Sequence, residues 1–417
     1  MNKLIDHNQF LKDLILTADH HLEKSAVDLD TFDSILRACL TIDEMREIGS
    51  FFTGQELASK AVSLFTTELS LDSIILDPAC GAGNLLIECS RKLDVKMTLS
   101  ETLREWGIVL NGFDIYQSFI DAARLRLIIE ALSRGVKKDC SLEQAFALLC
   151  NIKVKDALLV TEEELSSVTH LILNPPFTTV ESPKENYWKK GKVNAAGVFV
   201  DKYIRKLPQS CNVSIILPDV LRSGARYVYF RDFLNACVDG NHLIWGRFNS
   251  KTDVDVFIIH GVLRKNNNNL WKKSLLNYIP LSSRYDVRIG PLVAYRDPKI
   301  GNEYPYFHAK NAISWSVIVK ETETRRFAGT VLKPPFVLIK RTSNPNDKYR
   351  ALATVINLTE YVAVENHMIV VTPKNGNLED CIRLLDILKS QTTNDFLNER
   401  IRLRHLTVGA VKEIPIG

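Results

Sequence analysis

The sequence lacks the features of membrane proteins and of disulfide-rich secreted proteins. No apolar run approaches the roughly 20 residues that a membrane-spanning helix needs. The first ten residues, MNKLIDHNQF, lack the basic and then apolar pattern of a secretory signal. Eight cysteines are scattered along 417 residues without a CxxC pair or a Cys/His metal spacing. We therefore expect reduced thiols, a cytoplasmic location, no metal site and no membrane partner.

Two common phosphate-binding motifs are also missing. Closely spaced glycines follow the first predicted strand, at Gly81 and Gly83, but their spacing is not the GxGxxG of dinucleotide-binding proteins. No Lys followed by Ser or Thr comes after them, so this turn is not a nucleoside triphosphate loop either. On its own, this pair of glycines is weak evidence for any ligand.

The composition is that of a globular protein with a sizeable core. It is 46% hydrophobic and 24% charged, and the length fits two domains. The net charge of +4 is unevenly placed, because residues 281–417 contain 20 Lys and Arg against 14 Asp and Glu, whereas residues 1–280 contain 33 against 35. A basic C-terminal part indicates a polyanionic partner, although ordinary surface variation would produce the same imbalance.

Apolar periodicity predicts an α/β fold for the first two thirds of the chain. Residues 1–48 have helical spacing, and Thr31 or Asp30 could cap the second helix there. Further along, short apolar runs alternate with amphipathic segments, which is typical of a doubly wound, mainly parallel sheet. The strand candidates are SIILD (73–77), VLNGFD (109–114), IKVKD (152–156), THLILN (169–174), NVSIILP (212–218), LIWGRF (243–248) and VDVFIIHGVL (254–263); the helical segments include 55–69, 84–93, 116–132 and 198–207. The last two strands have a short connection, so we expect them to pair antiparallel at one edge.

A polar, turn-forming stretch, RKNNNNLWKKS (264–274), predicts a domain boundary. Beyond it, apolar segments interrupted by Pro and Gly indicate short strands and loops, and residues 378–401 are helical again. We therefore predict three parts: a helical N-terminal extension at 1–50, an α/β domain at 51–265 and a mixed α+β domain at 280–417.

Acidic residues end three of the predicted strands. Asp77 closes the first strand directly before the turn of Gly81 and Gly83, Asp114 closes the second, and Asp156 closes the third. Ligands of open parallel sheets bind outside the carboxyl ends of the strands, where carboxylates accept from ribose hydroxyls or amines. Any one of these acids is better explained as a turn residue or a helix cap. Three in register with one Gly-rich turn indicate a ligand site.

Four motifs, in this order, resemble those of the S-adenosylmethionine-dependent amino-methyltransferases of DNA. They are DPACGAGNLL (77–86), GFDIY (112–116), KVKDAL (153–158) and NPPF (174–177). FFTGQELASKAV (51–62), ahead of them, is similar to the segment that closes over the methionine end of the cofactor in the gamma arrangement. The resemblance implies S-adenosyl-L-methionine as cofactor and a seven-stranded Rossmann-like methyltransferase fold for residues 51–265.

The resemblance also implies roles for individual residues. Thr53 would bind the methionine carboxylate, and Asp77 would lie near its ammonium group. Asp114 would hold the ribose, and Asp156 the adenine amino group. The full set of cofactor residues is Thr53, Asp77, Ala79, Gly81, Gly83, Asp114, Ile115, Asp156 and Asn174. The family often has proline after the threonine, where this chain has Gly54, so the conformation of that loop is open. Thr53 would also serve as a helix N-cap.

NPPF (174–177) follows a buried strand and has the groups that methylation of an amine needs. The lone pair of a base amino group is delocalised into the ring, and two acceptors on its hydrogens free that pair for attack on a sulfonium methyl. The side-chain oxygen of Asn174 and the carbonyl of Pro175 are the predicted acceptors. Pro175 and Pro176 fix φ at about −65°, so both acceptors are held rigidly. Phe177 offers an aromatic face to a flipped-out base, and Phe248 has the position of the family's second aromatic, with a core position as the alternative.

The C-terminal part is similar to the target-recognition region of some adenine methyltransferases from bacterial restriction-modification systems. The segments that carry the similarity are 289–298, 335–356 and 361–371. Basic residues alternate there with aromatics and amides, which can contact phosphates and base edges. Across the chain the predicted DNA contacts are Arg222, Arg226, Arg296, Lys340, Arg341 and His367, with Arg231 facing phosphate or solvent. A solvated surface is the alternative for each.

These motifs favour a DNA adenine-N6 methyltransferase that acts on double-stranded DNA and carries its own recognition domain. Cytosine-N4 methylation uses the same acceptors, although such enzymes more often have Ser in place of Asn174. Methylation of guanine N2 in ribosomal RNA or of a protein glutamine, and a non-catalytic DNA-binding subunit of a restriction-modification complex, remain open. NPPF has no cysteine, which excludes carbon-5 cytosine chemistry. The front extension is too short for a nuclease domain, so we expect any restriction endonuclease to be a separate subunit.

Overall fold

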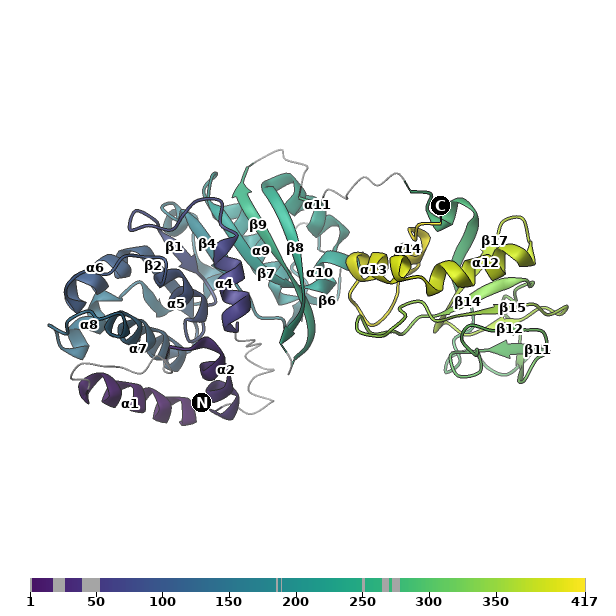
Figure 1. The fold of residues 1–417 in the computed structure, drawn as a ribbon, viewed down its shortest axis with the longest axis horizontal. Helices are drawn as coiled ribbons and strands as arrows, with labels where there is room; N and C mark the ends of the chain where they lie inside the picture. Colours follow the sequence, from purple (N-terminus) through teal and green to yellow (C-terminus); the bar gives the residue numbers. More distant parts are fainter. Residues whose placement is uncertain are drawn as a thin grey trace. The chain divides into compact units, whose positions relative to one another are not determined.

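The predicted strands of the first part form one sheet. In the computed structural model its order is β3-β2-β1-β4-β7-β9-β8 (Figure 1). The strands are β1 (Ile75–Asp77), β2 (Leu110–Asp114), β3 (Ile152–Val154), β4 (His170–Leu173), β7 (Asn212–Pro218), β8 (Val238–Asn249) and β9 (Thr252–Leu263). The first five in this order are parallel neighbours, β9 runs antiparallel to β7, and β8 runs antiparallel to β9. The predicted doubly wound sheet with an antiparallel edge is confirmed.

The chain divides into two compact units, residues 1–273 and 274–417. The structure describes residues 2–17, 27–39, 53–184, 187–188, 190–249, 252–264, 270–271 and 278–416. Several predictions from the sequence therefore lie outside the described residues. They concern the helical stretches at 18–26 and 40–48, the two phenylalanines at the start of FFTG, and most of the polar stretch 264–274.

Alternate residues of the central strands enter two different cores, as the two-residue period of a strand requires. In β7, Ile216 packs into one core, whereas Ile215 and Leu217 pack into the other. The first core lies under the helices α1, α2, α4, α5, α6 and α7, and the second under α9, α10 and α11. Their bounds are α1 (Asn2–Thr17), α2 (Leu29–Cys39), α4 (Gln55–Ser63), α5 (Asn84–Ser90), α6 (Leu99–Val109), α7 (Gln117–Ser133), α8 (Leu142–Leu148), α9 (Ala195–Lys206), α10 (Asp219–Ser223) and α11 (Val228–Cys237).

The two N-terminal helices belong to the first unit, and α1 lies along α7 (Figure 1). Helix α2 begins at Leu29, earlier than predicted. Its cap is Asp28, whose carboxylate accepts from the N–H of Thr31 at 2.6 Å. The prediction that Thr31 or Asp30 caps this helix is wrong, because both lie inside the first turn.

Two helices and a hairpin were not predicted. Helices α6 and α8 lie between the strands β1 and β3, and a short antiparallel hairpin of β5 (Thr179–Glu181) and β6 (Lys192–Asn194) follows NPPF. The hairpin strands are three residues long, and all of β5 is exposed, so they carry no alternating apolar pattern. The hairpin is relevant to the site because its first strand begins two residues after NPPF.

The second unit is built on a five-stranded sheet with the order β10-β17-β14-β15-β12 and a smaller sheet with the order β13-β11-β16. The strands are β10 (Tyr285–Ile289), β11 (Asn302–Phe307), β12 (Val317–Ile318), β13 (Thr324–Phe327), β14 (Phe336–Lys340), β15 (Ala353–Ile356), β16 (Ala363–Val364) and β17 (Met368–Pro373). Helices α12 (Leu378–Lys389), α13 (Gln391–Arg400) and α14 (Val408–Lys412) pack on the face that carries Val337 and Ile339. The predicted mixed α+β character is confirmed. In the part of the chain that the structure describes, no helix combines the length and apolar character of a membrane span.

Candidate active site

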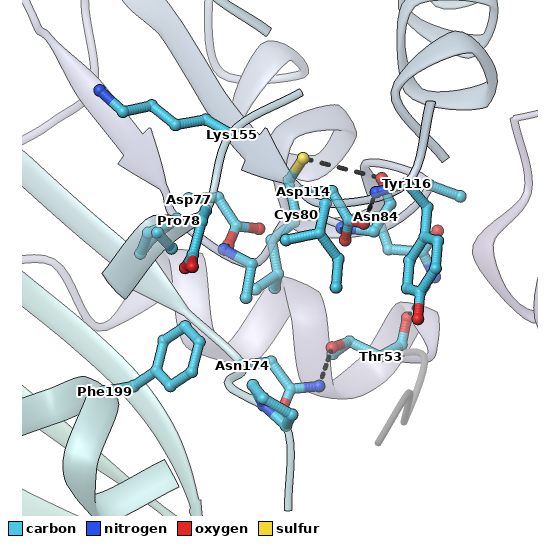
Figure 2. A pocket seen from close by; sticks show the side chains of 18 residues that line it. Thr53, Asp77, Pro78, Cys80, Asn84, Asp114, Tyr116, Lys155, Asn174 and Phe199 are labelled. Atoms are coloured by element: carbon cyan, nitrogen blue, oxygen red, sulfur yellow. Dashed lines mark hydrogen bonds between the residues drawn. The ribbon is translucent and has the colours of Figure 1, made fainter. Parts of the chain in front are cut away.

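A cavity opens at the carboxyl ends of β1, β2, β3 and β4 (Figure 2). This edge of an open parallel sheet is where such folds bind their ligands. The cavity is lined by Thr53, Asp77, Pro78, Ala79, Cys80, Gly81, Ala82, Asn84, Leu85, Asp114, Ile115, Tyr116, Lys155, Asp156, Ala157, Asn174, Pro176 and Phe199. Most of the predicted cofactor residues are therefore gathered around one space. Gly83, the one predicted cofactor residue outside this lining, lies in the same turn.

The Gly-rich turn takes a form that only glycine adopts easily. Gly81 and Gly83 have φ values of 50° and 85°, in the left-handed region. A Cβ on Gly83 would lie 2.9 Å from the Cβ of Ala123 in α7, so a larger residue would push the turn away from that helix. The turn brings α5 to the cavity with its backbone close to the strand ends.

The buried carboxyl group of Asp77 and the half-buried one of Asp114 face the turn. Asp77 is 1% exposed and accepts from the N–H of Ala79 at 3.2 Å. Asp114 accepts from Gly81 N–H at 3.2 Å and from Tyr116 N–H at 2.9 Å. Burial raises the pKa of Asp77 to about 8, with the charge of Asp114 adding to the rise and the Ala79 N–H opposing it. Burial likewise raises the pKa of Asp114 to about 6.

The third acid of the set differs from the first two. Asp156 is exposed at the rim, and its carboxylate accepts from the N–H of Leu158 at 2.8 Å. It caps a short 3₁₀ turn, as the alternative interpretation of strand-end acids proposes. It also lines the cavity, so the capping contact and a ligand contact are compatible.

Asn174 lies at the end of β4 and is joined to Thr53 across the cavity. Its Nδ2 donates to Thr53 Oγ1 at 3.0 Å (Figure 2). Because the amide nitrogen makes this bond, the amide oxygen is turned to the other side of the side chain. Thr53 is only 2% exposed. It is not the N-cap of α4, because that position belongs to Gly54, so the capping role predicted for Thr53 is wrong.

The two predicted aromatic residues meet at the end of NPPF. The rings of Phe177 and Phe248 pack edge to face, with centroids 6.1 Å apart and planes at 81°. Phe248 is 5% exposed and belongs to the core under α4 to α7, whereas Phe177 is half-buried. The carbonyl of Phe177 accepts from Nδ2 of Asn194 at 3.1 Å, and the N–H of Asn194 donates to the Tyr227 hydroxyl at 2.9 Å. NPPF is thus held at both ends, by Thr53 and by Asn194.

These residues fit S-adenosyl-L-methionine by their chemistry. Asp77 and Asp114, whose pKa values are raised, gain from an ammonium group and from hydroxyl donors, which are among the polar groups of this cofactor. Residues 30–237, about half of the chain, match the model of the family described as N-6 DNA Methylase. The chain belongs to the N-6 DNA methylase family. No curated protein sequence matches the chain significantly.

Solved structures of restriction-modification proteins are similar to this N-6 DNA methylase, and the first of those named below shares its fold. The Type IIL restriction-modification enzyme MmeI, in complex with DNA, is 11% identical with a TM-score of 0.56, over 93% of this chain and 70% of that one. The type IIG restriction endonuclease BpuSI is 15% identical with a TM-score of 0.43, over 93% and 63%. A modification subunit of a putative type I restriction enzyme from Vibrio vulnificus YJ016 is 18% identical with a TM-score of 0.42, over 59% and 51%. The chain thus spans between half and two thirds of the length of these last two proteins.

Several further cavity residues of the N-6 DNA methylase were not predicted as site residues from the sequence, among them Asn84, Lys155 and Phe199. Asn84 follows the glycine turn directly, so its place at the helix start was a usable signal. Phe199 comes from α9, and the helical pattern alone does not say which of its apolar residues reaches the cavity (Figure 2). Lys155 pairs with Glu164, and its side chain extends away from the cavity centre (Figure 2).

The arginines predicted to contact DNA from α10 and the following turn are engaged within the protein. Arg222 is 7% exposed and pairs with Asp219 at 2.6 Å, so its guanidinium is not available to DNA and this prediction is corrected. Arg226 is half-buried and donates to the carbonyl of Lys190 at 2.9 Å. Arg231 donates to the carbonyl of Gly224 at 2.8 Å. A charge in the sequence does not reveal such local partners.

The DNA contacts predicted in the second unit lie at one end of its larger sheet. Lys340 ends β14 opposite Met368, and the N–H of Arg341 donates to the carbonyl of His367 at 3.1 Å. The loop with Arg296, which pairs with Asp297 at 3.0 Å, leaves β10 at the same end. A segment that was not predicted joins them, because Ser343 N–H donates to the Arg404 carbonyl at 2.8 Å and Leu406 N–H to the Arg341 carbonyl at 2.8 Å. Arg404 and His405 are exposed there.

Proposed function

We propose that this N-6 DNA methylase transfers the methyl group of S-adenosyl-L-methionine to the exocyclic N6 amino group of an adenine in double-stranded DNA. The observation that carries the proposal is the bond from Asn174 Nδ2 to Thr53 Oγ1. It fixes an amide acceptor beside a cavity lined by Asp77 and Asp114, in a chain of the N-6 DNA methylase family.

The cofactor supplies an electrophilic methyl group on a sulfonium centre. Asn174 Oδ1 and the Pro175 carbonyl accept the two hydrogens of the base amine, which restores nucleophilic character to its nitrogen. Asn174 is oriented for this by Thr53, and Pro175 and Pro176 hold the second acceptor rigid. No general base with a special pKa is required, because the proton leaves only after the nitrogen has become cationic.

Phe177 is the proposed platform for the flipped base. Its ring is supported from the side by Phe248, and its backbone is held by Asn194. Stacking of a base on an aromatic ring contributes about 1–3 kcal/mol. Phe248, which is buried, acts as the support rather than as a second exposed face.

Double-stranded DNA is the proposed partner of the second unit. Its exposed basic residues His367, Arg404 and His405 and the half-buried Arg341 lie at one end of the larger sheet, where they can contact phosphates and base edges. Such contacts release counterions, so binding should weaken as salt is raised. We further propose that the protein works in a restriction-modification system, with a separate endonuclease subunit.

The test is transfer of tritiated methyl groups to DNA of varied sequence, followed by nucleoside analysis. Label in N6-methyladenosine derivatives supports the proposal, and label in N4-methylcytosine would redirect it to the other amine. Label only in RNA or protein, or cofactor binding without transfer, would contradict it. The Asn174→Ala protein serves as the inactive control, since its cavity keeps both acids.

A further inference from the structure

Arg126 of α7 is a fully buried arginine directly behind the Gly-rich turn. Its Nη1 donates to the carbonyl of Ala82 at 2.7 Å and to Oδ1 of Asn84 at 2.6 Å. The ring of Phe32, on α2, lies 3.7 Å from the guanidinium carbon. Burial lowers the pKa of Arg126 to about 9, so the group remains a cation at neutral pH. An N-terminal helix therefore covers a charge that holds the turn.

The contacts of Arg126 continue to Asn174. Nδ2 of Asn84 donates to the carbonyl of Thr53 at 2.7 Å. Thr53 Oγ1 in turn accepts from Asn174 Nδ2 at 3.0 Å. The guanidinium fixes the oxygen of the Asn84 amide, which turns its nitrogen toward Thr53, and each following bond depends on the previous orientation. This chain of hydrogen bonds leads from the rear of the cavity to the proposed methyl-transfer site.

A second contact from α2 reaches the same segment from the other side. Asp30 Oδ1 accepts from the N–H of Gln55 at 3.0 Å, at the start of α4. A Cβ on Gly54 would lie 2.6 Å from that carboxylate oxygen. The Asp30 carboxylate would have to shift to admit a side chain at position 54, so glycine at this position favours the contact. Helix α2 thus contacts Gln55 directly, and it reaches Thr53 through Arg126 and Asn84.

The N-terminal helices are anchored firmly enough to exert this control. Arg91, which directly follows α5, donates to the carbonyl of Val27, two residues before α2, at 2.9 Å. Asn8 of α1 is buried and donates to the carbonyl of Ser118 at 2.8 Å. Phe32 itself belongs to the same core as α5 and α7. The N-terminal helices therefore support the cavity as well as covering the outer surface of α7.

We propose that Asp30 and Arg126 are positioning residues through which helix α2 sets the conformation of Thr53 and Gly54, and so the affinity for the cofactor and the orientation of Asn174. The proposal rests on the proposed function for the identity of the cofactor. It gives the N-terminal helices a role in the site, although none of their residues lines the cavity.

The first experiment replaces Asp30, which is exposed, so the substitution does not endanger folding. In the apo protein, Asp30→Ala should speed hydrogen exchange at Gln55 by about tenfold, since its N–H loses a charged acceptor. Titration calorimetry should show weaker binding of S-adenosyl-L-methionine by about threefold to tenfold, with kcat changed less than KM. The matched control is Asp139→Ala, because Asp139 accepts from the Ser100 N–H at the start of α6 at 2.9 Å, remote from the cavity. That variant should leave the dissociation constant and kcat unchanged.

The second experiment compares two arginines of α7. Arg126→Met should weaken cofactor binding by about tenfold or more and lower kcat as well, because the chain of bonds ends at Asn174. Arg126→Lys should restore part of both, since an ammonium group can reach one of the two acceptors. Arg124→Met is the control. Arg124 also lies near a phenylalanine, Phe146, and donates to a carbonyl, that of Ile152 at 2.8 Å, but not at the cavity.

The outcomes separate this proposal from the proposed function. Equal effects of each variant and its control, or normal Gln55 exchange and cofactor affinity in a folded Asp30→Ala protein, would overturn the positioning role. An Arg126→Met protein that fails to fold leaves the decision to the Asp30 pair. A wild-type protein that binds the cofactor but transfers no methyl group contradicts the proposed function alone, and the ratios of dissociation constants still decide the role of α2.

Discussion

The proposed site residues of the two units are opposite in charge and opposite in placement. In the first unit, Asp77 is buried and Asp114 is half-buried at a cavity, and the loss of solvent raises the pKa values of both. In the second unit, Arg404, His405 and His367 are exposed at the end of a sheet. Acids that lose water contacts on folding regain hydrogen bonds from the donors of a small ligand. Exposed basic residues instead attract a polyanion through charge interactions that salt screens. The comparison predicts that chemistry and DNA affinity can be damaged separately.

The largest expected effect is the loss of the methyl-transfer step alone. Asn174→Ala removes one acceptor of the amine, and kcat should fall by about 10³-fold, in the range seen when one preorganised polar group is removed from an active site. The dissociation constant for S-adenosyl-L-methionine should change less than threefold, because Asp77 and Asp114 remain. Single-turnover transfer and titration calorimetry measure the two quantities. Parallel losses of both would mean that the loop is only structural.

A comparably large effect is expected in the second unit from its own buried arginine. Arg350 is 1% exposed and donates to the carbonyls of Ser343, Ile401 and Leu403 at 2.9–3.0 Å. Arg350→Met leaves these acceptors unpaired and should destabilise residues 274–417 by about 3 kcal/mol. Denaturant unfolding with separate probes in the two units measures this.

The cofactor affinity of the Arg350→Met protein should stay normal while its DNA affinity falls, since two of the held loops carry the exposed bases. Arg383→Met is the control, because Arg383 is 65% exposed and pairs weakly with Asp380 at 3.9 Å. A loss of cofactor binding in the Arg350 variant would break the comparison between the units.

A smaller effect concerns pH and the first unit. The folded pKa of Asp77 is raised to about 8 from an ordinary value of 3.8, so between these values the folded protein binds the proton that the unfolded chain has released. The contribution of Asp77 therefore makes the apo protein less stable as pH rises from about 4 to 8. Asp77→Asn should remove at least about 1.4 kcal/mol of that fall, which corresponds to one pKa unit.

Unfolding free energies of wild type and Asp77→Asn at pH 5 and pH 8 provide the measurement. Cofactor binding to the wild type should also release protons near pH 7, because an ammonium group favours the ionised carboxylate. Calorimetry in buffers of different ionisation enthalpy detects this release. A proton uptake would show that Asp77 is not beside a cation.

The smallest expected effect sharpens the other half of the comparison. Arg404→Ala should weaken DNA binding by a few-fold at low salt and reduce the slope of log affinity against log salt by about one contact. Methyl transfer at saturating DNA should be unchanged. Fluorescence anisotropy at several salt concentrations distinguishes this from Asp395→Asn, a substitution at an exposed acid of α13 that should not reduce the slope.

The sequence predicts the first unit well because its signals are local. Strand, acid and glycine turn follow one another within a few residues, and parallel strands bring Asp77 and Asp114 to the same end of the sheet. Helix α8 could also have been found, since Ser141 and Gln144 form a capping box. The same signal was available for α6, where Thr98 precedes Glu101 by three residues and caps the helix.

The remaining features could not be predicted, because they depend on contact partners that the residue type does not reveal or that are distant in the chain. Arg222 is the residue type that contacts DNA phosphates, but in the folded protein it is buried and pairs with Asp219. The 402–406 segment lies beside Arg341 because it pairs with the residues that follow β14, and Arg350 also binds it. The hairpin of β5 and β6 is too short and polar to show a period. The link from α2 to Thr53 passes through Arg126, which looks in the sequence like an ordinary helix residue.

The contact between Asp30 and Gly54 has a consequence for how this protein could have diverged. A side chain at position 54 would place its Cβ 2.6 Å from the Asp30 carboxylate oxygen, so the carboxylate would have to shift and its bond to the Gln55 N–H would weaken. The two positions are expected to vary as a pair among relatives, with proline accompanied by a small residue on the docked helix. A family member without this helix would not have this restriction at position 54.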